Sequence, residues 1–507
     1  MEPIKGFQLV LLTIAVSLGI FMNVLDTSIA NVAIPTIAGN MGVSADEGTW
    51  VITSFTVTLA IFLPITGWLS RRFGEVRLFA LSTFLFTVAS VCCALSTSLT
   101  MLIFFRVFQG AVAGPMIPLS QSILLANYSD ERKGLATALW ATVAVAAPVI
   151  GPILGGYLTD NYTWPWIFYI NVPIGLFSVY FTWMILKDRD TKIVKLPVDY
   201  IGLILLAIGV GCLQVLLDKG KDLDWFNSNA IITLACISTV TLTFFVGWEL
   251  TDKHPIVDLT LFKRRNFSIG TLGISLGYMA YFGSVVILPL WLQTQQNYTP
   301  TWAGVATSPV GVIPLILSPF MGILMKKFDL RVIVSIGFFI FAYSSFWTSG
   351  FNTDISFNII ALSRLAVGAA LPFFFIPLIT ISLSGLHSSQ IASASGLSNF
   401  CRILAGSFGT SIFVSMWDTR ERVHQSKIVE TLTPYDPHLH TALTQLQSTG
   451  MSEASSYAEV TSLAVNQAYM LSTNDIFWIS GVLFLILMIS VWFARPPFSM
   501  RAGVAAE

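Results

Sequence analysis

The sequence predicts an all-α membrane protein of fourteen transmembrane helices, arranged as two six-helix halves and two inserted helices. Three features predict it: a low content of charged residues, long apolar runs and an internal repeat. Charged residues make up 11% of the 507 positions and hydrophobic residues 54%, whereas soluble chains are about 25% charged. This composition excludes ordinary soluble domains and disordered chains. The 27 basic and 27 acidic residues cancel, so nothing favours binding to nucleic acid.

Each apolar run is long enough to cross a bilayer as a helix, which takes about 20 mostly apolar residues. The runs do not alternate apolar and polar positions, so they are typical of helices and not of barrel strands. The predicted spans are 9–32, 49–70, 77–97, 101–124, 134–158, 165–186, 199–218, 228–250, 268–293, 302–325, 331–349, 358–380, 392–416 and 475–494.

Lysine and arginine set the orientation of the spans. With the N-terminus inside, 19 basic residues fall on the inner side and 5 on the outer side. The other three, Arg106, Arg364 and Arg402, lie within spans. This bias predicts an even number of spans and both termini on the inner, cytoplasmic side.

One connection between spans is long. Residues 417–474 would lie on the outer face and are rich in Ser, Thr and Gln. We expect a solvated loop, in which 453–470 is a possible short amphipathic helix. The alternative is a docking surface or a lid.

An internal repeat relates the two ends of the chain. Residues 67–77 resemble 322–331 at an offset of 255, and residues 106–110 resemble 364–368 at an offset of 258. Two pairs at nearly one offset predict duplicated halves around a central cavity, an architecture of transporters. The expected units are 1–190, an inserted pair of helices with flanking loops at 191–265, and 266–507.

Asp26 is the acidic residue placed well inside a predicted span. A carboxylate in hydrocarbon costs several kcal/mol unless it is paired, hydrated or protonated, so it marks a functional site by default. Helix rise places Arg106 at a depth compatible with contact. Two interpretations stay open: a proton-coupling carboxylate with Arg106 as its partner, or a fixed pair that only locks two helices together.

Four segments carry a resemblance to a known family. They are Leu25–Pro35, Arg106 with Gln109 and Gly110, Gly151–Gly156, and Trp166–Gly175. In this order and on these spans they resemble the motifs of the fourteen-span drug:proton antiporter family of the major facilitator superfamily. The resemblance covers essentially the whole chain.

The resemblance implies proton-driven export of lipophilic or amphipathic drugs by alternating access. It also implies a multi-pass protein of the bacterial inner (cytoplasmic) membrane. It further implies two partners, a periplasmic membrane-fusion adaptor and an outer-membrane channel. The alternative is a proton-coupled exporter of a narrower natural substrate, such as a siderophore or metabolite. A membrane enzyme or receptor is disfavoured, since no paired His/Asp/Glu cluster, nucleotide loop or metal motif occurs within the spans. We therefore expect no cofactor and no metal.

The resemblance also assigns motif or gating positions. These are Asn31, Gln109, Gly110, Gly151, Pro152, Gly155, Gly156, Gly67, Arg71 and Gly74. One position departs from the family pattern, because Arg71 stands where the loop motif usually has an aspartate. Glu75 is the acidic residue nearby that could replace it.

The substrate cavity is expected to be apolar and aromatic, which suits varied lipophilic compounds. The candidates for its lining are Asn23, Trp140, Tyr278, Tyr281, Phe374, Asn399 and Arg402. For each aromatic residue the alternative is packing that faces lipid. Arg402 could bind an anionic group of a substrate or hold a network with Asn399.

Overall fold

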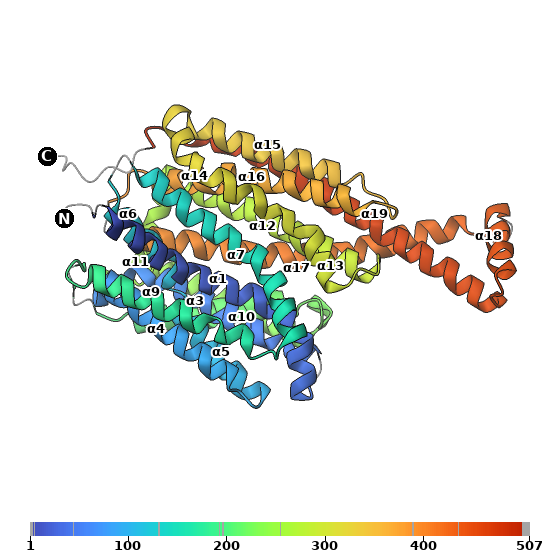
Figure 1. The fold of residues 1–507 in the computed structure, drawn as a ribbon, viewed down its shortest axis with the longest axis horizontal. Coiled ribbons are helices and arrows are strands. Elements are labelled where there is room, and N and C mark those ends of the chain that lie inside the picture. Colours follow the sequence, from blue (N-terminus) through green and yellow to red (C-terminus); the bar gives the residue numbers. More distant parts are fainter. Residues whose placement is uncertain are drawn as a thin grey trace.

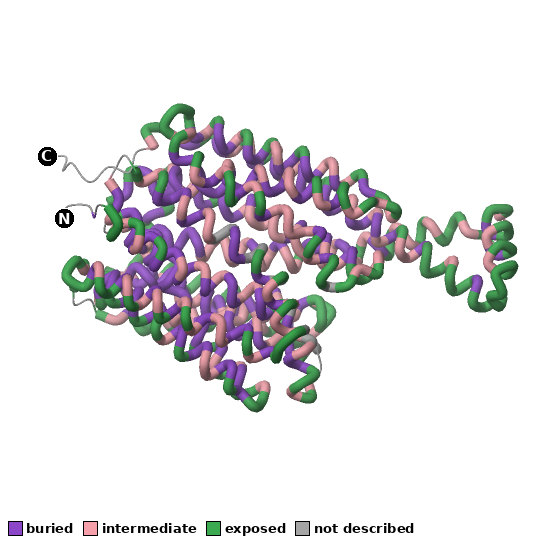
Figure 2. The backbone as a smooth tube through the Cα atoms, viewed as in Figure 1, coloured by how far each residue is buried: buried purple, intermediate pink, exposed green. Residues whose placement is uncertain are grey.

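A computed structural model describes residues 4, 6–43, 45–129, 132–191, 193–194, 197–253, 255–387, 390–433 and 436–498. Throughout these residues the regular structure is helical, and long helices lie side by side along one axis (Figure 1). The interior is buried, and exposed residues lie on the outer sides and at both ends (Figure 2). The number of long apolar helices makes the chain a multi-pass membrane protein.

The N-terminal half is built from nine helices in the described residues. They are α1 (Phe7–Met41), α2 (Ala45–Gly48), α3 (Trp50–Phe73), α4 (Glu75–Ala94), α5 (Leu99–Ala113), α6 (Met116–Asn127), α7 (Lys133–Asn161), α8 (Trp166–Tyr169) and α9 (Asn171–Leu186). The predicted span 101–124 is not one uninterrupted helix, since it divides into α5 and α6 at Gly114 and Pro115. Pro115 has no backbone N–H for the helical hydrogen bond to residue 111, which explains the break.

Two inserted helices follow, α10 (Tyr200–Lys219) and α11 (Asn229–Thr251), with the short η2 (Trp225–Asn227) between them. They pack against each other, and α10 also contacts α3 and α17. The contact with α17 includes a hydrogen bond from Gln214 Nε2 to Ser407 Oγ at 2.6 Å and one from Ser411 Oγ to the Leu217 carbonyl at 2.6 Å. The inserted pair therefore touches both halves.

The remaining elements start at residue 259 and include the predicted C-terminal unit 266–507. They are η3 (Leu259–Lys263), α12 (Arg265–Thr294), α13 (Pro300–Thr307), η4 (Ser308–Gly311), α14 (Val312–Lys327), α15 (Leu330–Thr348), α16 (Phe357–Leu383), α17 (Ile391–Thr431), α18 (Pro437–Ser448), α19 (Glu453–Ser490) and η6 (Val491–Phe493). The first residues of α1 and the last of α19 lie at the same end of the molecule, here called the termini end (Figure 1).

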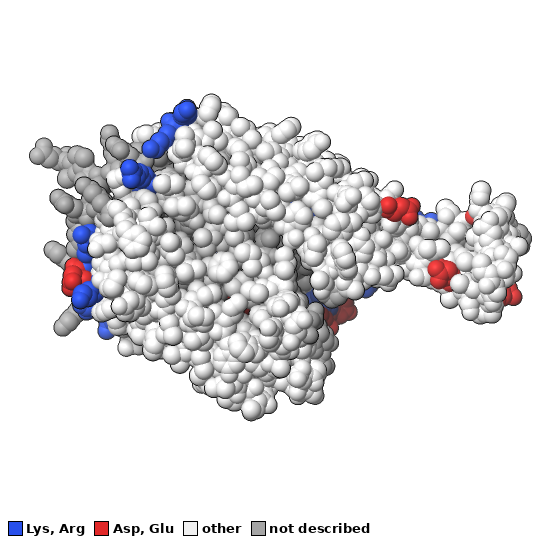
Figure 3. Space-filling model, viewed as in Figure 1, with Lys and Arg blue, Asp and Glu red and all other residues white. Residues whose placement is uncertain are grey.

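The span prediction agrees with this structure. Among the described residues, 13 helical segments are long and apolar enough to cross a membrane. The remaining predicted span, 134–158, falls on α7, a helix of 29 residues that packs against α1 and α14. On the face in Figure 3, Lys and Arg gather at the termini end, and the middle of the molecule is almost free of charge.

The prediction of a loop over 417–474 is wrong. Helix α17 has 41 residues and α19 has 38, so α17 is about 60 Å long, twice the thickness of a hydrocarbon core of about 30 Å. Both helices therefore run on beyond the bundle, and α18 joins them at the tip (Figure 1). Residues 417–474 are here called the helical extension. The short helix expected at 453–470 is the first part of α19.

The two halves repeat one close contact. A Cβ atom on Gly110 of α5 would strike the carbonyl oxygen of Phe55, and a Cβ atom on Gly368 of α16 would strike that of Val310. Phe55 and Val310 are themselves 255 positions apart. The glycines of the repeat thus serve the same purpose in each half, since only glycine lets the two backbones approach so closely.

The halves meet tightly at the termini end. Gly67 of α3 lies against Ser393 of α17, and Gly396 lies against the Leu63 carbonyl. Ser395 donates a hydrogen bond to Gln121 Oε1 of α6. The two halves are therefore in direct contact at this end.

Candidate functional site

The site is a polar network buried inside the N-terminal half. Asp26 of α1 and Arg106 of α5 form an ion pair, and their side chains are 1% and 0% exposed. Both lie in otherwise apolar helices with no water-facing alternative, so each polar atom needs a partner within the protein. Sequence reasoning matched the depths of these two residues, and the structure brings them together.

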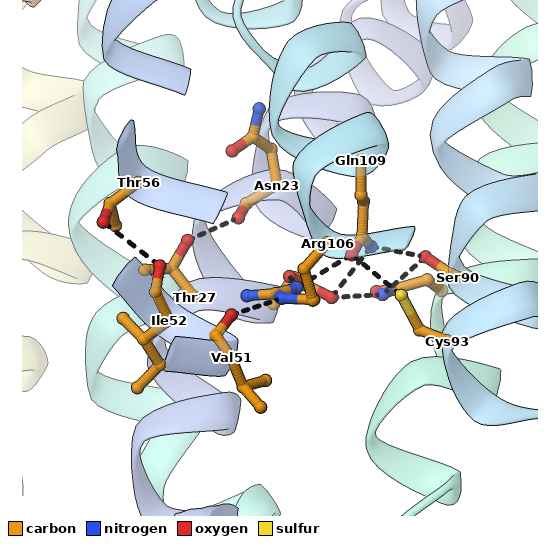
Figure 4. Close-up of polar contacts among 11 residues, drawn as sticks. Asn23, Thr27, Val51, Ile52, Thr56, Ser90, Cys93, Arg106 and Gln109 are labelled. Atoms are coloured by element: carbon orange, nitrogen blue, oxygen red, sulfur yellow. Dashed lines mark hydrogen bonds and ion pairs between the residues drawn. The ribbon is translucent and has the colours of Figure 1, made fainter. Parts of the chain in front are cut away.

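Three side chains donate to the Asp26 carboxylate. Two of them, Arg106 and Gln109, lie next to each other in Figure 4. Arg106 Nη1 donates to Oδ2. Gln109 Nε2 and Asn171 Nδ2 donate to Oδ1 at 3.2 and 3.0 Å. The carboxylate is thus held by helices α1, α5 and α9 together.

Arg106 is fixed by its other contacts as well. Its Nε donates to the Val51 carbonyl of α3 at 2.9 Å, and its Nη1 also reaches Gln109 Oε1 at 2.8 Å. The guanidinium lies over the Phe55 ring at 4.3 Å from the ring centre and 5.6 Å from that of Phe168. Aromatic faces favour a cation that has lost its water. In addition to its pairing with Asp26, Arg106 is therefore held by contacts with α3 and α8.

Sequence reasoning did not place Ser90 or Asn171 in the site. Ser90 Oγ of α4 accepts hydrogen bonds from Gln109 Nε2 at 2.8 Å and from Asn171 Nδ2 at 3.2 Å. Asn171 lies within the sixth-span motif, but the motif does not indicate which residue it bonds to. Its signal was a carboxamide inside an apolar span, since such a group must find hydrogen bonds there. Ser90 gave no comparable signal, because serine is common on membrane helices.

The chemistry of this arrangement depends on the charge of Asp26. An ionised carboxylate only accepts hydrogen bonds, which matches the three donors around it. A protonated carboxyl carries one O–H donor and no charge, so at least one donor loses its acceptor and Arg106 loses its counter-charge. Protonation of one atom thus changes the contacts of three helices.

The motif residues of the fifth predicted span lie between α7 and α1. A Cβ atom on Gly151 would be 2.5 Å from Ser28 Cβ, and one on Gly155 would be 3.1 Å from the Ile29 carbonyl. A Cβ atom on Gly156 would meet nothing within 4 Å. The side chain of Pro152 is outside the described part of the chain. Gly151 and Gly155 therefore permit close contact between α7 and α1, the helix that carries Asp26.

Asn31 does not join the network. It is exposed on α1, five residues beyond Asp26. Its motif role stays a prediction.

The loop motif is organised by an acidic residue that sequence reasoning did not select. Gly74 has a φ of 88°, a conformation that favours glycine, and precedes α4. Asp190 accepts from the N–H groups of Val76 and Arg77 at 2.9 and 3.2 Å. A carboxylate at a helix N-terminus is stabilising.

Neither Arg71 nor Glu75 occupies that position. Arg71 Nε donates to the Gly67 carbonyl within α3 at 3.3 Å. Glu75 is buried and accepts from Ser122 Oγ of α6 at 2.9 Å. In the repeated loop Asp329 caps its own helix and pairs with Arg331 at 2.7 Å. The hydrogen bond from Arg331 holds the pKa of Asp329 below its usual value.

Three of the cavity candidates are packed in the interior. Asn23 Nδ2 donates to the Ala113 carbonyl at 2.9 Å, and Trp140 Nε1 donates to Ser120 Oγ at 2.9 Å. Phe374 is 0% exposed and contacts the rings of Phe338 and Phe341. In this structure all three side chains are buried among the helices.

The other candidates lie together in the C-terminal half. Tyr278 stacks on Phe282 with ring centres 5.2 Å apart, and the Arg402 guanidinium lies over Tyr278 at 4.8 Å. Arg402 Nη2 donates to Asn399 Oδ1 at 3.0 Å. Tyr281 contacts Phe341 at 5.7 Å.

Two arginines of this half lack the counter-charge that Arg106 has. Arg402 is partly exposed, and its polar partner is Asn399. Arg364 is buried and donates to Thr348 Oγ1 at 2.8 Å and to Ser363 Oγ at 3.2 Å. Within the described residues neither forms an ion pair with a carboxylate. The two halves of the repeat thus differ in charge at their centres.

Comparison with known proteins gives concordant results. A family model described as Major Facilitator Superfamily matches residues 16–410. The multidrug export protein EmrB of Haemophilus influenzae is 52% identical over 500 residues, which cover 98% of each chain. The fatty acid resistance protein FarB of Neisseria gonorrhoeae is 45% identical over 501 residues, 99% of each chain. The solved structure of the proton:xylose symporter XylE has a TM-score of 0.59 at 13% identity, with 96% of this chain and 95% of that chain covered. The last likeness concerns the fold alone.

Proposed function

This chain belongs to the major facilitator superfamily, and we propose that it exports lipophilic and amphipathic compounds in exchange for protons. It is a secondary transporter and not an enzyme. Its similarity over nearly its whole length to the multidrug export protein EmrB supports drug-type substrates. The observation that carries the proton coupling is the buried Asp26–Arg106 pair with its donors from three helices.

Proton coupling explains the buried Asp26–Arg106 pair better than a contribution to the stability of the fold does. A buried ion pair is weak evidence for stability, because the cost of removing both charges from water can exceed their attraction. A proton on Asp26 weakens the link between α1, α5 and α9, and its release restores the link. One charge that crosses a potential of 100 mV supplies about 2.3 kcal/mol. That suffices for roughly a 50-fold gradient of a neutral substrate per proton.

A narrower second candidate is the export of lipophilic anions. Arg402 is a cation with no carboxylate partner in the described part of the chain, and it lies beside the aromatic face of Tyr278. An amphipathic acid would give this arginine its counter-charge and place its apolar part on the aromatic side chains. The similar protein FarB is a fatty acid resistance protein, and fatty acids are amphipathic acids.

We further propose that the termini end faces the cytoplasm and that the protein resides in the bacterial inner membrane. Basic residues gather at that end, as the positive-inside rule requires. The helical extension then projects into the periplasm, where a membrane-fusion adaptor that leads to an outer-membrane channel would contact it. Its reach beyond the bundle supports this role.

The test of coupling compares the wild type with Asp26→Asn in proteoliposomes. With an imposed proton gradient we expect the wild type to accumulate a lipophilic substrate and to move protons in the opposite direction. Asp26→Asn should abolish uphill accumulation, since an amide has no titratable proton. Glu75→Gln serves as the control at another buried acid. Uphill pumping by Asp26→Asn at matched protein levels would assign coupling to a different residue.

The role of the extension is tested by its removal. A variant that joins Thr431 to Glu453 through a short glycine–serine linker lacks α18. We expect it to pump normally in proteoliposomes but to confer no drug resistance on cells, because the adaptor loses its contact. Full resistance of cells with this variant would show that the adaptor docks elsewhere.

A further inference from the structure

A second pair of acidic residues lies away from Asp26, where the inserted helices join the two halves. Asp199 precedes α10, and Glu249 is in the last turns of α11. They are 9% and 2% exposed. Nothing in the proposed coupling mechanism uses them.

Each carboxyl has one satisfied oxygen. Asp199 Oδ1 accepts from the Gly202 N–H at 2.8 Å and from Trp248 Nε1 at 3.0 Å. Glu249 Oε2 accepts from the Val257 N–H at 3.1 Å. These bonds tie the start of α10 and the segment before η3 to the end of α11.

The other two oxygens have no hydrogen-bond partner in the structure. They meet at Gly202, where the lack of a side chain leaves space for them. A Cβ atom there would be 2.6 Å from Glu249 Oε1 and would also strike Asp199 Oδ2. Two unsatisfied carboxyl oxygens, one from each inserted helix, therefore converge on the same point.

No positive charge compensates this pair among the described residues. None of the ion pairs formed there involves Asp199 or Glu249. Asp252, three residues after Glu249 in the chain, adds a further acidic residue to this segment. Two buried carboxylates that approach the same point disfavour double ionisation, because like charges repel strongly in a medium of low dielectric constant.

We propose that Asp199 and Glu249 share one proton and form a second proton-binding site of this protein. The proton bridges Asp199 Oδ2 and Glu249 Oε1, so that one carboxyl donates to the other carboxylate. It holds α10 to α11 and keeps Glu249 in place for the Val257 amide. Its loss makes the two carboxylates repel each other and loosens the connection from the inserted pair to the C-terminal half.

Infrared spectroscopy of the purified protein in lipid tests for the shared proton. The measurements use an Asp26→Asn background, which removes the carboxyl of the coupling site. A carboxylic-acid carbonyl band that shifts in D2O is expected at neutral pH and should disappear when the pH is raised. Glu249→Gln and Asp199→Asn should each lack it, whereas Asp252→Asn should keep it. A band unchanged in Glu249→Gln would overturn the proposal.

Thermal unfolding gives a second measurement that uses folded variants. In the wild type the native pair keeps a proton that the free carboxyls of the unfolded chain have lost, so stability falls as the pH rises through the titration of the pair. Between about pH 6 and about pH 9 the unfolding midpoint of the wild type should fall more than that of Glu249→Gln. Glutamine remains neutral and can still donate to Asp199. Equal slopes for the two proteins would contradict a shared proton.

A metal ion is the other occupant that two carboxylates attract. Addition of Na⁺, Mg²⁺ or Ca²⁺ at constant pH should leave the infrared band and the unfolding midpoint of the wild type unchanged. One of these ions could instead remove the band and raise the unfolding midpoint of the wild type, with no such effect on Glu249→Gln. That result would show that the site binds this cation and not a proton. This test does not depend on transport, so its failure and the failure of Asp26 coupling are separate results.

Discussion

At the scale of single residues, the difference between Arg106 and its repeat mate Arg364 determines what each half does. Arg106 has Asp26 as its counter-charge. Arg364 has the hydroxyls of Thr348 and Ser363 instead. An offset of 255 from Asp26 leads to Tyr281, which is not acidic. The duplicated frame is therefore kept, but among the described residues only the arginine of the N-terminal half has a carboxylate partner.

Substitution of Arg402 tests the use of its positive charge. Arg402→Gln should weaken the apparent affinity for a lipophilic carboxylate about tenfold or more, equivalent to about 1.4 kcal/mol, and leave a neutral substrate unaffected. Arg402→Lys should retain most of the affinity for the acid. The measurement is KM for both substrates in proteoliposomes. An equal loss of apparent affinity for the acidic and the neutral compound would mean that Arg402 only supports the fold.

At the scale of helices, breaks and glycines decide how the buried network around Asp26 is assembled. The division of the fourth predicted span into α5 and α6 occurs at Pro115, beyond the turn that presents Arg106 and Gln109. Gly110 brings α5 against α3, whose Val51 carbonyl accepts from Arg106. Gly151 and Gly155 bring α7 against α1 next to Asp26. Close backbone contact thus positions the helices that hold the network.

A pair of glycine substitutions tests the contact between α1 and α7. Gly151→Ala puts a methyl group 2.5 Å from Ser28 Cβ, and such overpacking costs about 1–3 kcal/mol. We expect a lower unfolding midpoint and slower transport. Gly156→Ala lies five residues away on the same helix, where a Cβ meets nothing within 4 Å, and should be tolerated. Equal behaviour of the two variants would contradict a tight contact at Gly151.

At the scale of the whole molecule, the two halves close on each other at the termini end. Gly67 against Ser393 and Gln121 with Ser395 join α3 and α6 to α17. The inserted α10 adds contacts to both halves towards the other end. Lys219 Nζ donates to Thr49 Oγ1 at 2.7 Å, and Lys221 pairs with Asp418 at 3.0 Å. Alternating access requires the contacts at the termini end to break and re-form.

Gly67→Val tests this closure. The added side chain would occupy the position of Ser393, so the termini end should stay partly open. In a protein without native cysteines, Ser395→Cys should react faster with a water-soluble maleimide when Gly67→Val is present. Transport should fall at the same time. Unchanged labelling and transport would show that the contact between Gly67 and Ser393 does not control access.

The sequence by itself determined the features that depend on local composition. Apolar runs of membrane length gave the spans, because hydrocarbon demands such runs wherever they lie in the fold. The repeat offset gave the two halves, and the cost of a carboxylate in lipid singled out Asp26.

The tertiary structure decided everything that depends on which helices are neighbours. Ser90 and Asn171 join Asp26 from α4 and α9, and Asp190 caps a helix more than a hundred positions away. Asn23, Trp140 and Phe374 prove to be packed in the interior. The polar composition of 417–474 predicts a loop. The segment is nevertheless helical, because α17 and α19 extend without interruption from their apolar parts into it. Hydropathy records which solvent a residue prefers and does not record its partner, and partners are set by the packing of segments distant in the chain.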